Sequence, residues 1–132
     1  MAEKLCTLRT KGGGKYTETS LWTNPSSGTL FGGQTVTLSD NISNYKYLKV
    51  RYKNNTTVDQ VGIIIVDIAN FISQSPAPNN YNFPGMLTSN LSYARSFVYA
   101  SANKIQFGTC YRITNGTANN SYSIPLEILG IE

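Results

Sequence analysis

The sequence predicts an all-β fold, an antiparallel β-sandwich of jelly-roll-like form. Two features of the composition favour it: only 14% of the 132 residues are charged, and Asn, Ser, Thr and Tyr replace the missing charge. This mixture disfavours long surface helices and favours strands joined by polar turns. The third feature is spacing, because runs of β-branched and aromatic residues alternate with clusters of Asn, Gly, Ser and Pro. A chain of this length has room for one core, so we expect a single domain.

Seven segments have the composition of strands, and residues that favour turns separate them. In chain order they are Thr17–Thr23, Gln34–Ser39, Tyr47–Lys53, Gln60–Asp67, Tyr93–Ser101, Lys104–Thr114 and Ser121–Ile131. Asp67–Ser73 has room for one helical turn, and Asp40 is placed to cap a turn through its carboxylate.

The alternation of side chains predicts which strands are covered on one face and which on both. In Tyr47–Lys53, we expect Leu48, Val50 and Tyr52 to be buried and Lys49, Arg51 and Lys53 to face water. We interpret these cations as a solvated strand face, because nucleic-acid binding requires a broader basic patch. Ile63–Val66 is apolar on both faces, which predicts a central strand covered on both sides.

The same alternation makes a prediction for each cysteine. Over Lys104–Thr114 it places Phe107 and Tyr111 inward and Cys110 on the less buried face. Cys6 falls in the N-terminal tail, and two cysteines over this length do not make a disulfide framework. We therefore expect free thiols.

The first residues are expected to serve attachment. Gly12–Gly14 have no side chains to pack, so residues 1–15 are interpreted as an arm ending in a hinge and residues 16–132 as the head. Lys15 is followed by Tyr16, where a phosphate-binding loop would need Ser or Thr. No segment has the roughly 18 apolar residues of a membrane helix, and the start lacks a secretory apolar stretch. We expect no membrane insertion, and synthesis in a cytoplasm.

The inventory of reactive side chains argues against catalysis. The sequence has no histidine, which removes the commonest general base and most zinc sites. Its seven acids show neither the close pairing expected of a glycosidase nor the alternation of a calcium loop. We therefore expect no enzyme activity, no catalytic residue, no metal site and no cofactor.

The remaining side chains are suited to recognition. Nine Tyr, one Trp and many Asn combine flat apolar area with hydrogen-bonding groups, as sugar-binding surfaces do. The candidate ligand-binding residues are Trp22, Tyr81, Phe83 and Tyr93. Trp22 is either a core residue or a contact residue. Tyr81 and Phe83 lie in the long irregular segment Ser73–Pro84, where ligand contact and simple loop packing are both open.

Several segments together resemble a module of bacteriophage and prophage structural proteins from gut Firmicutes. They are Leu21–Pro25, Gln34–Asp40, Asn44–Leu48, Cys110–Ile113 and Asn120–Ile131, and the resemblance covers nearly all of residues 15–132. Such modules lie at the tips of tail fibres or other virion appendages. The resemblance implies a β-sandwich that assembles as a homotrimer. No long shaft precedes the module here, which favours a head fibre or a capsid decoration over a tail fibre.

Three functional hypotheses follow. The first is a virion structural protein, a fibre head that binds a bacterial surface glycan and contacts other virion proteins through residues 1–15. The second is a head fibre or capsid decoration protein without receptor binding. The third is a free carbohydrate-binding module. The first two place the protein in the virion after synthesis in the host cytoplasm, and none involves nucleic acid.

Overall fold

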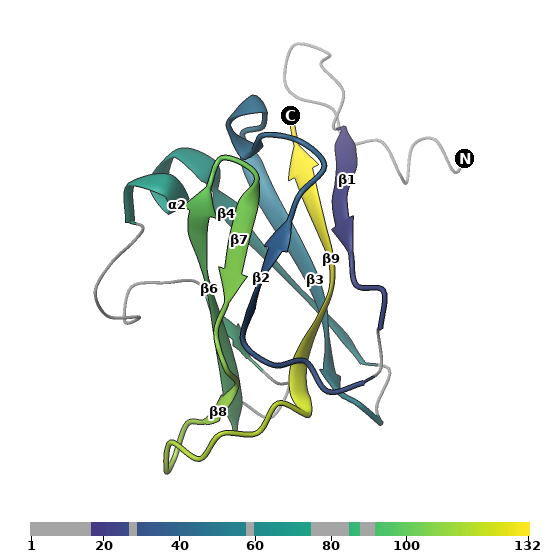
Figure 1. The fold of residues 1–132 in the computed structure, drawn as a ribbon, viewed down its shortest axis with the longest axis vertical. Coiled ribbons are helices and arrows are strands. Elements are labelled where there is room, and N and C mark those ends of the chain that lie inside the picture. Colours follow the sequence, from purple (N-terminus) through teal and green to yellow (C-terminus); the bar gives the residue numbers. More distant parts are fainter. Residues whose placement is uncertain (1–16, 27–28, 58–59, 75–84, 88–91) are drawn as a thin grey trace.

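The computed structural model describes residues 17–26, 29–57, 60–74, 85–87 and 92–132, and these form two β-sheets packed face to face (Figure 1). The first sheet has four strands in the order β1-β9-β3-β4. Their bounds are Glu18–Thr23 for β1, Tyr122–Ile131 for β9, Tyr47–Asn55 for β3 and Val61–Asp67 for β4. The first and last strands of the chain therefore lie side by side.

The second sheet has five strands, of which four follow the order β2-β7-β6-β5, while the short β8 pairs with β6. Their bounds are Gln34–Thr37 for β2, Lys104–Phe107 for β7, Tyr93–Ser101 for β6, Gly85–Leu87 for β5 and Tyr111–Arg112 for β8. Every pair of named strands in the described residues is antiparallel. The predicted all-β, antiparallel sandwich is confirmed.

The core lies between the two sheets, and much of it is filled by the alternate residues that the sequence pattern predicts. The prediction fails at the end of β3, where Lys53, expected to face water, is buried and Tyr52, expected to be buried, is half-buried. Leu48 and Val50 of β3 are fully buried, and Phe97 of β6 meets Phe107 of β7 with ring centroids 6.0 Å apart. Side chains on the inner faces of two aligned sheets interdigitate in this way when each strand alternates between core and solvent.

Two short helical segments cover one end of the sandwich. The helix α2 (Ile68–Gln74) follows β4 and buries Ile68 and Phe71. It has seven residues and is thus longer than the single turn expected at this place. The 3-10 helix η1 (Ile42–Asn44) follows Asp40, whose carboxylate accepts hydrogen bonds from the Asn41 N–H (2.7 Å) and the Tyr45 hydroxyl (2.9 Å). The N-cap of η1 is Asn41, whose side-chain oxygen accepts the Ser43 N–H (2.9 Å), so Asp40, predicted as the cap, supports the turn from one residue earlier. The Tyr45 hydroxyl, with the Asn41 N–H, lowers the pKa of the Asp40 carboxyl.

The prediction that Ile63–Val66 forms a central, fully covered strand is wrong. In the described residues β4 pairs with β3 alone and is the last strand of its sheet. Ile64 and Val66 pack against the core, but Ile63 and Ile65 point away from it and are 54% and 52% exposed. A strand that is apolar on both faces can be central, or it can be an edge strand whose outer face lacks a cover within the chain.

The single strand predicted over Lys104–Thr114 is also wrong, because it breaks into β7 and β8. The break falls at Gly108, whose N–H donates to the Ser96 carbonyl. Beyond Gly108 the side chains no longer alternate between the buried and exposed faces as they would in one continuous strand. Cys110, expected on the less buried face, is fully buried, while Tyr111, expected inward, is exposed. Cys110 is a free thiol, as expected. Cys6, the arm of residues 1–15 and its glycine hinge lie outside the described residues.

Candidate functional site

Trp22 faces the interior of the sandwich because of a bulge in β1. The register with β9 pairs Ser20 with Leu129 and Trp22 with Ile128, so Leu21 is the extra residue. A bulge of this kind reverses the side on which the following residues fall. It places Trp22 on the same side as the buried Ile128, directed toward the second sheet.

One part of Trp22 packs in an aromatic cluster that joins the two sheets. The Trp22 ring lies 6.2 Å from that of Phe31 and 6.0 Å from that of Phe107, and Phe31 meets Phe107 edge to face at 5.5 Å. Such offset and edge-to-face contacts contribute beyond simple burial. Phe31 and Phe107 are buried while Trp22 is only half-buried. The packing interpretation of Trp22 therefore accounts for part of the side chain, and solvent reaches the rest.

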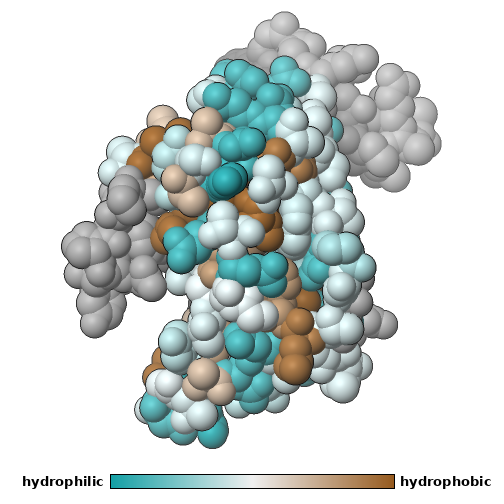
Figure 2. Space-filling view, in the orientation of Figure 1, coloured by the Kyte–Doolittle hydropathy of each residue, from teal (hydrophilic) through white to brown (hydrophobic). Residues whose placement is uncertain are grey.

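The remaining part of Trp22 lines a hollow of about 390 Å³ between β1 and β2, called here the Trp22 pocket. Its described lining combines Trp22 with polar and apolar residues of the segment that joins the two strands and of β2 itself: Asn24, Pro25, Ser26, Thr29, Leu30, Phe31, Gln34, Thr35 and Val36. Figure 2 shows a largely hydrophilic face with small hydrophobic patches, one of them beside this connecting segment. A flat aromatic wall with amide and hydroxyl groups around it is suited to a sugar ring.

Asn24 fixes one side of the pocket to the first sheet. Its backbone N–H donates to the Leu126 carbonyl (2.8 Å) and its side-chain amide donates to the Pro125 carbonyl (2.8 Å). Its side-chain oxygen accepts the N–H of Ser26 (2.8 Å), which forms a local turn. Asn24 is buried, so its side chain holds the pocket wall and is already committed to protein partners.

Arg95 supports the other side of the pocket from within the sandwich. Its guanidinium lies 5.3 Å from the centroid of the Phe31 ring, a cation–π contact. Its Nε donates to the Ser123 carbonyl (2.8 Å), Nη1 to the Gly108 carbonyl (2.8 Å) and Nη2 to the Tyr122 carbonyl (3.1 Å). Ser123 has φ of 50°, a left-handed backbone that is strained for a residue with a side chain, and the Arg95 contact holds it in place.

The burial of Arg95 and Cys110 determines their chemistry. Arg95 is completely inaccessible to solvent, and desolvation lowers the pKa of its guanidinium to about 10, which still leaves it charged at neutral pH. Burial raises the pKa of the Cys110 thiol, an effect that the charge of Arg95 partly offsets. A buried thiol that stays protonated is a poor nucleophile. This pair is therefore part of the structural support and not a reactive centre.

The four residues predicted as ligand contacts are not brought together. Tyr93 stacks face to face on Tyr122 with ring centroids 3.8 Å apart, and it does not line the Trp22 pocket. Tyr81 and Phe83 lie outside the described residues. Of the four predicted ligand contacts, Trp22 is the one that the structure places in the lining of a pocket.

Other residues at the pocket were missed from the sequence. Leu30, Phe31, Gln34 and Thr35 carry no motif, and their one signal is position: the first two lie in the connection that follows β1, and the other two begin β2. Arg95 had a clearer signal, since it lies two residues from Phe97 on the same side of β6. Charged residues are almost never fully buried, so the pattern was not interpreted in that way.

Within the ranges that the structure describes, no group of three or more acidic, cysteine or histidine side chains gathers where a metal ion could be held. No known protein-family model matches the chain, and no curated protein matches it either.

Proposed function

We propose that this chain is a non-catalytic virion structural protein of a bacteriophage, an appendage head that binds a host surface glycan in the Trp22 pocket. The observation that carries the binding role is the pocket itself: an accessible part of an aromatic ring faces a hollow of about 390 Å³ with polar side chains at its rim. That volume is in the range of small-ligand sites, and one or two sugar rings match it in size. The sequence resemblance described above supports the virion location.

The pocket is held by the fold before any ligand arrives, which favours binding. Asn24 ties its start to β9, and the Phe31 N–H donates to the Asn120 carbonyl (3.1 Å) near its end. A site whose walls are already fixed loses less conformational freedom when it closes on a ligand. Gln34 and Thr35 remain exposed at the rim and can donate and accept hydrogen bonds.

Intrinsic fluorescence offers a direct test, because Trp22 is the single tryptophan of the sequence. We expect cell-wall polysaccharide from gut Firmicutes to change the Trp22 emission in a saturable way. Thr35→Arg places a long side chain in the pocket and should abolish that change. Thr37→Arg is the matched control, since Thr37 is exposed on the same strand but does not line the pocket, and it should bind normally.

Two results would count against glycan binding at this site. One is an unchanged emission across a panel of bacterial polysaccharides, and the other is equal binding by the Thr35→Arg and Thr37→Arg proteins. The second candidate function, a head fibre or capsid decoration without a receptor, would then be preferred. The exposed isoleucines of β4 favour an assembly role of this kind, whatever the pocket binds.

A further inference from the structure

The outward side of β4 is an exposed apolar surface on an edge strand. Val61, Ile63 and Ile65 point away from the core and are 45%, 54% and 52% exposed. No charged residue or proline occurs between Val61 and Val66. Edge strands of soluble proteins are normally protected from association by charges, prolines or bulges. The absence of that protection on three consecutive outward residues indicates that this surface is covered when the protein functions.

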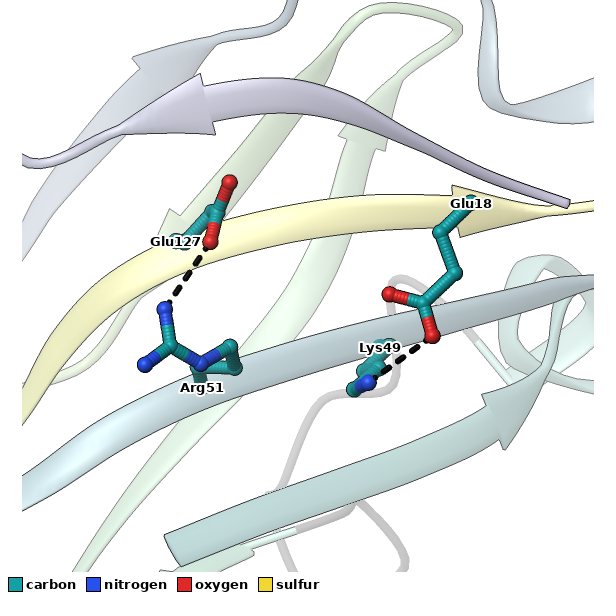
Figure 3. A network of polar contacts seen from close by, with 4 residues as sticks. All are labelled: Glu18, Lys49, Arg51 and Glu127. Atoms are coloured by element: carbon teal, nitrogen blue, oxygen red, sulfur yellow. Dashed lines mark hydrogen bonds and ion pairs between the residues drawn. The ribbon is translucent and has the colours of Figure 1, made fainter. Parts of the chain in front are cut away.

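Two of the cations beside this surface, Lys49 and Arg51, are paired with carboxylates of the chain. Lys49 and Arg51 of β3 pair laterally with Ile65 and Ile63 of β4. Figure 3 shows that each cation is engaged: the Lys49 ammonium contacts the Glu18 carboxylate at 2.9 Å, and the Arg51 guanidinium contacts the Glu127 carboxylate at 3.0 Å. These four side chains lie on β1, β9 and β3, so they extend the surface across the outer face of the sheet.

The pairing of these two cations makes some classes of binding partner a better fit for this surface than others. A nucleic acid or an acidic protein would need cations available to its phosphates or carboxylates, and the two cations next to the isoleucines are already paired. A second copy of this chain faces no such requirement. Although the chain carries a net charge of +4, two copies of this locally neutral surface can approach without opposing unpaired like charges.

We propose that the outward side chains of β4, with Ile63 and Ile65 at the centre, form the contact between copies of this chain. The surface is a regular strand flanked by ion pairs, so it matches an identical surface in shape, polarity and charge, as symmetric interfaces require. A self-matching contact of this kind is two-fold and gives a dimer, whereas the homotrimer that the sequence resemblance implies requires the β4 residues of three copies to meet around a three-fold axis. The contact does not depend on what the Trp22 pocket binds.

Sedimentation of the full chain over a range of concentrations tests this contact. The wild-type protein should sediment as an oligomer, and Ile63→Lys should shift it to the monomer by raising the dissociation constant about tenfold or more. Ile113→Lys is the matched control: Ile113 is 53% exposed, nearly the same as Ile63, but lies beyond β8 outside this surface. It should leave the oligomer unchanged.

A second variant separates loss of contact from loss of folding. Ile63→Thr keeps a β-branched residue suited to a strand while removing apolar area, and it should weaken association with an unchanged near-ultraviolet circular dichroism spectrum. A wild-type protein that stays monomeric at every concentration overturns the proposal. So does an oligomer that Ile63→Lys and Ile113→Lys affect equally. Because no glycan is present in these measurements, failure of the pocket proposal would leave their outcome unchanged.

Discussion

Arg95 is a cation buried between two sheets with carbonyl oxygens as its principal partners. In Arg95→Met the apolar stem is roughly retained, but the carbonyls of Gly108, Tyr122 and Ser123 lose their donor. Each buried polar group left without a partner costs about 1–3 kcal/mol, so we expect the free energy of unfolding to fall by about 3 kcal/mol or more. Denaturant titration followed by circular dichroism measures this change.

The control for Arg95 is Arg112, which is exposed on β8. Arg112→Met should change the free energy of unfolding by no more than about 0.5 kcal/mol. Arg95→Lys should recover part of the lost stability, because it keeps the charge without the planar set of donors. If Arg95→Met and Arg112→Met had the same small effect, the guanidinium would contribute nothing to holding β9 and the pocket wall together.

At the scale of the elements, β9 depends on a glycine that lets an aromatic ring approach it. A Cβ atom added at Gly130 would lie 2.6 Å from Cγ of Tyr45, next to the point where that ring joins its backbone. The far end of the ring is also held, because the Tyr45 hydroxyl donates to Asp40. Gly130→Ala should therefore lower the free energy of unfolding by about 1–3 kcal/mol, as overpacking does. Thermal unfolding and denaturant titration both report this quantity.

Gly62 provides the comparison within the same sheet. A Cβ atom there would lie 2.7 Å from Cζ of Tyr52, at the far end of that side chain. Gly62→Ala should cost less than Gly130→Ala, because the close atoms at Gly62 are at the end of the Tyr52 side chain and those at Gly130 are at the base of the Tyr45 ring. The reverse order of the two costs would show that Tyr45 moves more easily than its contacts suggest.

The strands could largely be predicted from the sequence, but their neighbours in the sheets could not. Period-two alternation identified the buried face of β3 at Leu48 and Val50, because the charged residues Lys49 and Arg51 follow them in turn. In β4 polar and apolar residues do not alternate, because Ile63 and Ile64 are the same residue type. Since β4 pairs with β3 alone, Ile63 is left exposed while Ile64 packs against the core. Which strand occupies the edge is decided by long-range pairing, and a local pattern carries no information about it.

The candidate site was less predictable than the fold, for a related reason. Trp22 stood out by its residue type, but the bulge at Leu21 that turns it inward depends on the register with β9. Phe31 and Arg95 reach the same region from the second sheet and its connections. A site assembled from segments far apart in sequence becomes visible only when the packing of the two sheets is known.

At the scale of the whole molecule, the two proposed surfaces occupy opposite edges of one sheet. In the order β1-β9-β3-β4, the Trp22 pocket adjoins β1 and the exposed isoleucines belong to β4. Copies joined through β4 would therefore leave each pocket accessible. Several weak sites carried by one assembly bind a repetitive surface much more tightly than one site does.

This separation predicts that Ile63→Lys affects binding to cells but not binding to a soluble sugar. A single pocket is unchanged by the substitution, so the titration of Trp22 emission with a short oligosaccharide should give the wild-type dissociation constant. Retention on whole bacteria should fall steeply, because linked sites can gain about 10²–10⁴ in avidity and a monomer loses that gain. Flow cytometry of cells with labelled protein measures the retention, with Ile113→Lys as the protein that should keep it. Equal retention by the two variants would mean that copies of the chain do not cooperate in binding, even if they associate.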